Sequence, residues 1–285
     1  MKIVVLGAAG QLGGAMLNAA TARHEAVGLG RRDVDVTESA ALTRTLLAAK
    51  PDVVINCSAF SQVDPAEDAP TQALAVNAMA VRTLARVAAT LDATLVHYST
   101  DFVFDGDGEG LNTEDREPNP SGVYASSKLI GEWFAADAPR HYVLRVESLF
   151  GGTRPMSSVD TLLNGILADR EITAFTDRTV SPSYVVDVAA ATLQILERRI
   201  PYGLYHCVNS GSTTWHQLTR ELARLCHKPE ALIATARMRD LNMRVRRPLN
   251  AALSNEKLRA AGVVMPTWEA ALAQHISTRL RQEAR

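Results

Sequence analysis

The amino-terminal segment places the strongest constraint on how this chain can fold. Residues 2–6 form an apolar, β-branched run, and the spacing Gly7-x-x-Gly10-x-x-Gly13 leads from it into residues 11–23, an alanine-rich segment that favours a helix. Glycine has no Cβ, so this turn can bend tightly and let a phosphate approach the backbone, where the amino end of the helix favours negative charge. The spacing predicts a strand, turn and helix that bind a dinucleotide pyrophosphate. A turn with a structural role alone is the alternative.

Strand-like runs and helix-like segments continue to alternate after this unit. Strands that are apolar throughout and separated by helices indicate a parallel sheet covered on both faces. The expected strands are residues 2–6, 26–29, 53–57, 94–99 and 143–146, and the expected helices include 38–50 and 71–91. We therefore predict an α/β fold with a doubly wound, Rossmann-like parallel sheet.

Beyond Gly151 the alternation gives way to shorter elements. Helices are expected at 159–169 and 185–199 and from Trp215 and Thr267, with one strand at 204–208. We predict a nucleotide-binding domain over residues 1–150 and a smaller substrate-binding lobe over residues 151–285, with some chain exchange back to the main sheet.

Composition narrows the class of ligand. The net charge of −1 over 285 residues gives no reason to expect nucleic acid or an anionic membrane as a partner. We find no uninterrupted apolar stretch of about 18 residues, and we expect a cytoplasmic protein with a small polar ligand. The three cysteines, Cys57, Cys207 and Cys226, are widely spaced and lack a CxxC pattern, so no metal site is expected.

The tip of the second expected strand indicates which dinucleotide binds. Gly30 stands where an acidic residue would bind the adenosine 2′-hydroxyl of NAD, and Arg31 and Arg32 follow it. Arginine suits a 2′-phosphate, so NADP is preferred over NAD; two solvated loop arginines are the alternative. Asp35 and Val36 can reach the adenine, although a cap for the next helix explains Asp35 as well.

Tyr124 and Lys128 form a candidate proton-transfer pair. Free tyrosine has a pKa near 10, so it transfers protons at neutral pH only if its phenolate is stabilised, which a nearby ammonium group does. Four-residue spacing puts both side chains on one face of a helix. A single pair with this spacing also arises by chance, so it is weak evidence alone.

Thr100 strengthens this interpretation. It ends the expected strand 94–99 in the run Tyr98-Ser99-Thr100-Asp101, where its hydroxyl can hydrogen bond the same substrate oxygen as Tyr124. A β-branched strand terminus is the alternative. The long polar loop 101–122 follows at the carboxyl end of a parallel strand, where such sheets bind ligands.

Further motifs follow in order along nearly the whole chain. They are the glycine turn, residues 56–59, Val63-Asp64, Glu67, Asn77, and residues 99–106, 124–128, 181–189, 203–206 and 247–250. In these motifs the chain resembles the extended short-chain dehydrogenase/reductase family, and within it the branch that reduces dTDP-4-dehydrorhamnose.

This resemblance implies an NADPH-dependent reduction of a nucleotide-linked 4-keto-6-deoxysugar, from dTDP-4-dehydrorhamnose to dTDP-L-rhamnose. Tyr124 would protonate the C4 carbonyl oxygen, Lys128 would bind the nicotinamide ribose and lower the tyrosine pKa, and Thr100 would orient the carbonyl. The cofactor-binding residues would be Gly7, Gly10, Gln11, Leu12, Gly13, Arg31, Asp35, Val36, Ser58, Ala59 and Lys128. The substrate-binding residues would be Val63, Phe102, Ser148 and Arg247, with an exposed arginine as the alternative for Arg247.

Two departures from the branch's pattern concern the sugar. Phe102 replaces a common tyrosine, and residues 145–148 read Arg-Val-Glu-Ser where the reductases often read Arg-Thr-Ser-Trp. Losing a hydrogen bond and an aromatic contact shifts affinity by roughly 1–3 kcal/mol, enough to change the preferred sugar without changing the reaction.

Two other functions are alternatives for a chain with these motifs. Related dehydratases carry an acidic residue immediately after Thr-Asp, and Phe102 cannot transfer a proton there, which argues against dehydration. The remaining alternative is a non-catalytic NADP-binding subunit resembling the regulatory β subunit of methionine adenosyltransferase. A homodimer through helices that flank the sheet is suggested by likeness alone.

Overall fold

A six-stranded parallel sheet forms the centre of the protein. The computed structural model describes residues 1–152 and 157–283. The strand order is β10-β5-β4-β3-β1-β2, and all neighbouring strands pair in parallel. Their bounds are β1 Lys2–Leu6, β2 Glu25–Leu29, β3 Val53–Asn56, β4 Thr94–Thr100, β5 His141–Val146 and β10 Gly203–His206.

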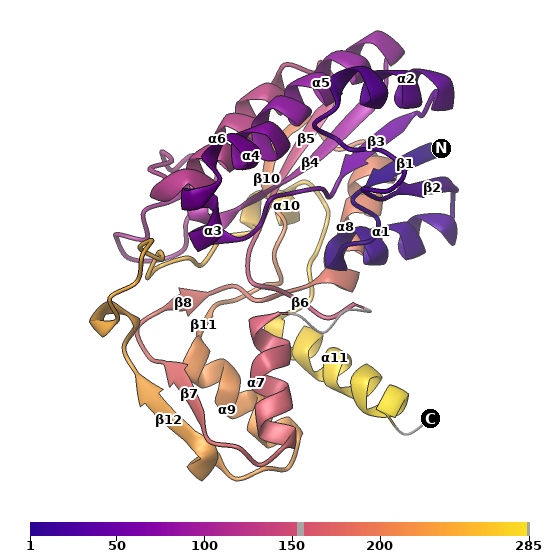
Figure 1. Cartoon of the computed structure of the whole chain (residues 1–285). Helices are drawn as coiled ribbons and strands as arrows, with labels where there is room; N and C mark the ends of the chain where they lie inside the picture. The colour runs from indigo at the N-terminus through magenta and orange to yellow at the C-terminus, as the bar shows by residue number, and fades with distance from the viewer. Residues whose placement is uncertain (153–156, 284–285) are drawn as a thin grey trace.

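Helices cover both faces of this sheet (Figure 1). Alternate residues of a strand point to opposite faces, so Ile3 and Val5 pack with α1 and α8, whereas Val4 and Leu6 pack with α2 and α5. The bounds are α1 Gln11–Thr21, α8 Val185–Arg198, α2 Ser39–Ala49, α5 Ala80–Leu91 and α6 Gly122–Ala136, which also lies on the α5 side. The predicted doubly wound fold is confirmed.

The connecting helices switch from one face of the sheet to the other at the adjacent strands β1 and β3. Helix α1 follows β1 on one face, and α2 follows β2 on the other. Such a switch opens a crevice outside the carboxyl ends of the strands, where doubly wound sheets bind their ligands. The glycine turn, residues 7–10, lies at this point.

A smaller part of the molecule lies below the carboxyl edge of the sheet in Figure 1. Its helices pack around one apolar core that includes Phe150, Leu163, Trp215 and Trp268. They are α7 Ser158–Leu167, α9 Trp215–Leu225 and α11 Trp268–Glu283. Three two-stranded sheets join them: β7 Ile172–Phe175 with β12 Ile233–Ala236, β8 Thr179–Val180 with β11 Thr213–Thr214, and β6 Leu149–Phe150 with β9 Ser183–Tyr184.

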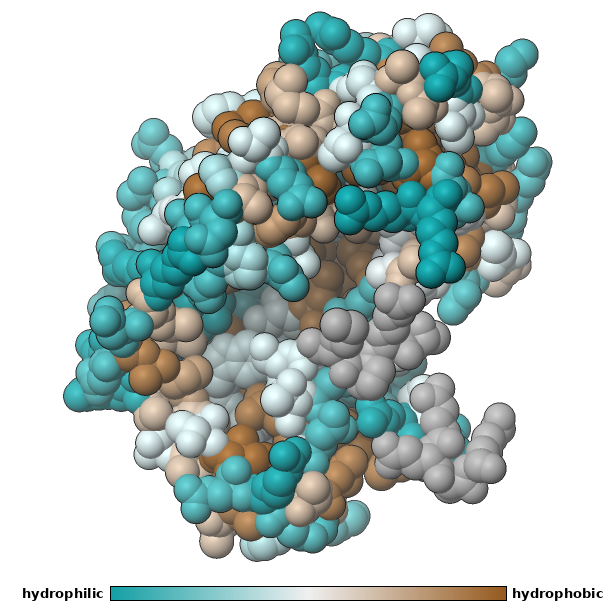
Figure 2. Space-filling model, viewed as in Figure 1, coloured by the Kyte–Doolittle hydropathy of each residue, from teal (hydrophilic) through white to brown (hydrophobic). Residues whose placement is uncertain are grey.

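Elements from the second half of the chain also belong to the layers of the main sheet. Helix α8 packs on the α1 face, and β10 is an edge strand beside β5. The division at residue 150 stays a prediction. Figure 2 shows the surface hollowed between the two parts of the molecule on the face in view.

The expected helix 71–91 is divided in three. It comprises α4 Pro70–Leu74, a π-helical turn η1 Ala75–Met79, and α5. By length and composition, the segment Pro70–Leu91 could cross a membrane. However, 44% of its most apolar 18-residue stretch is buried inside the protein. Val81 and Leu84 pack in the sheet core, so this segment acts as a core helix.

The remaining short helices are α3 Val63–Asp68, η2 Asp101–Val103, η3 Glu230–Leu232, η4 Met238–Asp240 and α10 Glu256–Ala260.

Candidate active site

The start of α6 fixes the position of Tyr124. Gly122 has φ +86°, and a Cβ there would lie 2.8 Å from Glu67 Oε1. That same oxygen accepts a hydrogen bond from the Val123 N–H at 2.7 Å. Glu67, on α3, thus binds a free N–H group of the first turn of α6, and it holds the tyrosine-bearing turn against α3.

Lys128 lies one turn further along α6 and is buried. Its Nζ donates to the Tyr98 carbonyl oxygen at 2.5 Å. Burial lowers the pKa of Lys128 to about 8, and the Glu132 carboxylate opposes that shift. At neutral pH the ammonium form therefore still predominates.

Tyr124 lies beside Thr100, at the end of β4. The two hydroxyls are within hydrogen-bonding reach, and the Tyr124 ring meets the Phe102 ring edge to face, with centroids 5.6 Å apart. Burial raises the pKa of Tyr124 to about 12, Thr100 opposes this, and Asp101 adds to it. In the chain alone the Lys128 ammonium group is directed at the Tyr98 carbonyl oxygen, and the lowering of the tyrosine pKa by Lys128 stays a prediction. Tyr124 holds its proton at neutral pH, as a proton donor requires.

The Thr100 hydroxyl has two neighbours within its own loop. It donates to Asp101 Oδ1 at 2.9 Å and accepts from the Phe102 N–H at 3.3 Å. The fold therefore brings Thr100, Tyr124 and Lys128 together at the carboxyl edge of the sheet.

The glycine turn fits a pyrophosphate. Gly7 has φ +71°, and a Cβ on it would lie 2.7 Å from the Ser58 backbone nitrogen; a Cβ on Gly13 would lie 2.1 Å from the Gly7 carbonyl oxygen. Gly10 precedes α1 without a side-chain cap, and the first turn has no acidic residue. The amino end of α1 is thus open to an anion, as a dinucleotide requires.

The neighbouring predicted cofactor residues differ in what they can offer. Gln11 Nε2 donates to the Gly151 carbonyl oxygen at 2.8 Å, and the Leu12 side chain is buried in the core, which leaves its backbone to face a ligand. Ser58 lies beside Gly7, and its hydroxyl donates to Asn56 Oδ1 at 2.5 Å. Ala59 is exposed in the same loop.

The adenosine end is open around Arg31. Its side chain is 80% exposed, and its nearest carboxylate oxygen, on Asp35, is 3.7 Å away, so the guanidinium can turn to a phosphate. Asp35 itself accepts hydrogen bonds from the N–H and hydroxyl of Thr37, at 3.0 and 2.7 Å. The Asp35 carboxylate therefore has its hydrogen-bond donors within this local turn just before α2. Val36 is half-buried beside it.

The predicted substrate residues Val63, Phe102, Ser148 and Arg247 lie on four different segments of the chain. Val63 is half-buried at the start of α3, and Arg247 binds the adjacent Asp64 through two hydrogen bonds of 3.0 and 2.6 Å. The Arg247 side chain is only 12% exposed, so the exposed-arginine alternative is wrong. Ser148 follows β5 with φ +42°, and its hydroxyl donates to Glu147 at 2.7 Å.

The likeness to known proteins covers the same residues that build this site. Residues 1–281 match the family described as the RmlD substrate binding domain. The chain belongs to this family.

Among its relatives is a dTDP-4-dehydrorhamnose reductase of Streptomyces griseus, 32% identical over 279 residues that span 95% of this chain and 91% of the relative. A reductase of the same name from Mycolicibacterium smegmatis is 37% identical over 213 residues; that alignment covers 74% of this chain and 64% of the relative.

Two solved structures of dTDP-4-dehydrorhamnose reductases superpose over 98% of the chain and the whole of each relative. That from Clostridium acetobutylicum has a TM-score of 0.92 at 29% identity. That from Bacillus anthracis, in complex with NADP, has a TM-score of 0.91 at 26% identity.

One residue of the ordered motifs, to which the sequence assigned no role, organises this RmlD-family site. Asn77, in the π-helical turn, exchanges hydrogen bonds with the backbone of Phe60 at 2.8 and 3.0 Å and donates to Ser127 Oγ at 2.9 Å. It therefore joins the loop after β3 to the turn of α6 beside Lys128. An asparagine inside an apolar helix was the available signal.

Also missed was a group of buried charges beside Thr100, formed by Asp101, Glu147 and Arg178. In the sequence, a glutamate directly after an apolar strand, Glu147, could have indicated this group. No sequence pattern marks Arg178, which follows β7, as a member of it.

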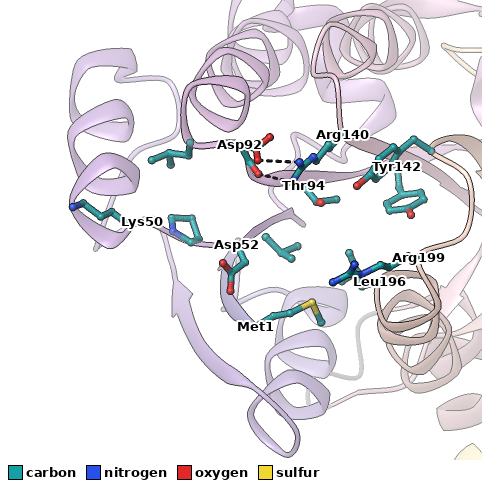
Figure 3. A pocket seen from close by; sticks show the side chains of 13 residues that line it. Met1, Lys50, Asp52, Asp92, Thr94, Arg140, Tyr142, Leu196 and Arg199 are labelled. Atoms are coloured by element: carbon teal, nitrogen blue, oxygen red, sulfur yellow. Dashed lines mark hydrogen bonds and ion pairs between the residues drawn. The ribbon is translucent and has the colours of Figure 1, made fainter.

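A cavity of about 760 Å³ lies elsewhere, at the amino edge of the sheet. In Figure 3 Lys50, Asp52, Arg140 and Tyr142 surround it. Lys50 and Arg199 sit just after α2 and α8, where cations complement the helix dipoles. None of the residues that line this cavity is a predicted site residue, so it is separate from the candidate active site.

The described residues contain no cluster of three or more His, Cys, Asp or Glu side chains able to hold a metal ion. The three cysteines all lie in the described part of the chain and are free thiols. Cys207 is buried, and Cys57 and Cys226 are half-buried.

Proposed function

We propose that this chain is an NADPH-dependent reductase that converts dTDP-4-dehydrorhamnose to dTDP-L-rhamnose. The observation that carries the proposal is the meeting of a protonated Tyr124, the Thr100 hydroxyl and the Lys128 ammonium at the carboxyl edge, beside a turn that admits a pyrophosphate. The names of the relatives agree with this function, which the sequence also predicts.

The residues divide the work of binding NADPH. The open amino end of α1, with Gly7, Gly10, Gln11, Leu12 and Gly13, would hold the pyrophosphate. Arg31 would bind the 2′-phosphate, Asp35 and Val36 would line the adenine side, and Ser58 and Ala59 would flank the nicotinamide half. The NADP complex of the Bacillus anthracis relative supports this choice of coenzyme.

The chemistry needs one hydride and one proton for each carbonyl group. Bound NADPH supplies the hydride to the sugar C4. Tyr124 would donate its phenolic proton to the oxygen, so the π bond of the carbonyl is replaced by one C–H bond and one O–H bond while the C–O single bond remains. Lys128 offsets the negative charge left on the phenol, and Thr100 holds the carbonyl oxygen in place. Val63, Phe102, Ser148 and Arg247 would contact the nucleotide sugar.

The test is turnover by the purified protein. A panel of nucleotide-sugar ketones, including dTDP-4-dehydro-6-deoxy-L-mannose, is mixed with NADPH or NADH, and loss of reduced-coenzyme absorbance is followed. We expect oxidation of NADPH with the dTDP sugar. Tyr124→Phe should lower kcat by about 10²–10⁴-fold and leave NADPH affinity unchanged.

A regulatory NADP-binding subunit would give the opposite result. It would show a thermal shift with NADPH but no turnover with any sugar in the panel. We further propose, from the family likeness alone, a cytoplasmic enzyme that forms homodimers.

A further inference from the structure

A short arginine-rich segment runs from the smaller part of the molecule to the start of α6. Residues 244–248 read Arg-Val-Arg-Arg-Pro, and we name them the strap. The chain can be followed at the left of Figure 1, where it leaves β12 and runs up toward α3. Before the strap, η4 is held in the smaller part, because Asp177 Oδ1 accepts a hydrogen bond from the Met238 N–H at 2.6 Å. The role inferred for the strap below rests on the proposed function.

Two ion pairs fasten the strap to α3. Arg244 binds the Asp68 carboxylate through two hydrogen bonds of 2.6 Å, in an exposed pair. Arg247 binds Asp64 through hydrogen bonds of 3.0 and 2.6 Å, and its side chain is only 12% exposed. A guanidinium that binds both oxygens of a carboxylate is fixed in orientation as well as in distance. The Arg247 pair is also less screened by salt, because it is partly buried.

The valine between these arginines lies against the first residue of α6. Val245 is 5% exposed, and a Cβ built on Gly122 would lie 2.9 Å from its Cγ1. The valine methyl therefore fills the space that a side chain at position 122 would need. Arg247 Nη1 also donates to the Val245 carbonyl oxygen at 2.8 Å, so the guanidinium that binds Asp64 holds the valine backbone as well.

These contacts surround the turn that carries Tyr124. Glu67 Oε1 would lie 2.8 Å from the same Cβ on Gly122, so Glu67 and Val245 both meet this glycine. Glu67 also accepts the Val123 N–H at 2.7 Å. The turn is therefore joined to α3 twice, directly through Glu67 and indirectly through the strap. A helix start that is held at two points has less freedom to tilt, and its tilt sets where the Tyr124 hydroxyl lies.

The far end of the strap meets the loop that follows β4. A Cβ on Gly106 would overlap the Pro248 Cα, so the two backbones are in contact there. Arg246 binds Asp107 of the same loop. Because this loop starts directly after Thr100, the strap touches both chain segments that carry a catalytic hydroxyl.

We propose that Val245 is a positioning residue for the proton donor. The ion pairs of the strap keep Val245 against Gly122, and this contact holds the turn so that the Tyr124 phenol stays within reach of the sugar carbonyl. Proton transfer requires the two heavy atoms to lie within about 2.6–3.2 Å of each other. A misplacement of about 1 Å lowers the rate by roughly 10²-fold. The strap begins in the smaller part of the molecule, so the seating of that part and the placement of Tyr124 are linked.

A double-mutant cycle tests this role. The kcat and KM for the dTDP sugar and the Kd for NADPH are measured for wild type, Val245→Ala, Tyr124→Phe and the double variant. Val245→Ala removes the methyl groups that meet Gly122, and it should lower kcat about tenfold with KM and NADPH affinity unchanged. In the Tyr124→Phe background no phenolic proton is left to place, so the same change should alter the residual kcat by less than about twofold.

Two further variants separate positioning from stability. Val87→Ala removes the same methyl groups from a valine of α5 that is 4% exposed. As the matched control, it should lower the unfolding midpoint and leave kcat unchanged. Val245→Thr keeps the branched shape at the contact with Gly122 and should retain the wild-type kcat.

The ratio of kcat in H₂O to kcat in D₂O is a second measurement on the same proteins. It should rise in Val245→Ala, because proton transfer from a displaced phenol limits the rate. This ratio decides the matter if Tyr124→Phe retains too little activity to measure.

An equal loss from Val245→Ala in both backgrounds would overturn the proposal, since the valine would then act on something other than the proton donor. An unchanged kcat or an unchanged solvent ratio in Val245→Ala would overturn it as well. In these outcomes the wild type is active, so the proposed function survives. A wild type that turns over no sugar overturns both.

Discussion

The buried ion pair between Glu132 and Arg145 offers a test of stability and catalysis in one substitution. Arg145 Nε and Nη2 donate to the two Glu132 oxygens at 2.8 and 2.7 Å, and the side chains are 2% and 7% exposed. The pair joins α6 to β5. Glu132→Gln removes the charge but keeps an acceptor, and Arg145 is left buried without its counter-ion.

Breaking one partner of a buried pair costs about 3–5 kcal/mol, and the retained amide oxygen places this change near the lower end. Urea unfolding followed by circular dichroism measures it, with an unchanged slope against denaturant. Glu256→Gln, which removes the carboxylate of an exposed pair with Arg259, is the control and should leave unfolding unchanged.

The second effect of Glu132→Gln is on Lys128, one helical turn before it. Because the Glu132 carboxylate raises the pKa of Lys128, its loss should move the alkaline fall of kcat/KM to lower pH. A loss of less than about 1 kcal/mol together with an unmoved pH profile would refute the reasoning for both roles of this pair.

Three further predictions concern the cofactor and the proton donor. Gly13→Ala should abolish NADPH binding in a fluorescence titration, because its Cβ would lie 2.1 Å from the Gly7 carbonyl oxygen; retained affinity would show that the turn relaxes. Arg31→Ala should weaken NADPH binding much more than NADH binding, since only NADPH carries the 2′-phosphate, and equal effects would place that phosphate elsewhere. For the wild type, kcat/KM should fall as pH rises through about 8, where Lys128 loses its proton; a profile that stays flat well above that value contradicts its electrostatic role.

The main sheet could be predicted because its signals are local. The apolar runs of β1 and β3 and the glycine spacing between β1 and α1 depend on residues close in sequence, and they formed as expected. The two-residue strands β8 and β9 carried no period that a pattern could reveal. The π-helical turn was also hidden, because Asn77 is held by Phe60 and Ser127 from other segments.

The sequence predicted which residues form the candidate site, but it did not predict how their surroundings shift their pKa values. Thr100, Tyr124 and Lys128 were found from strand ends and helical spacing. The direction of the Tyr124 pKa could not be, because burial and Asp101 decide it. The family and the doubly wound fold are confirmed, whereas the roles of the individual site residues stay predictions.

The return of α8 and β10 to the main sheet has a consequence for synthesis on the ribosome. A nascent chain that has emerged only as far as residue 184 exposes the apolar face that α8 covers, including Ile55 and Leu144, and leaves β5 without its outer neighbour. Such a surface is prone to aggregate until its cover arrives. A fragment cut at residue 150 would therefore be insoluble by itself, and the nucleotide-binding half can mature only after most of the polypeptide has been made.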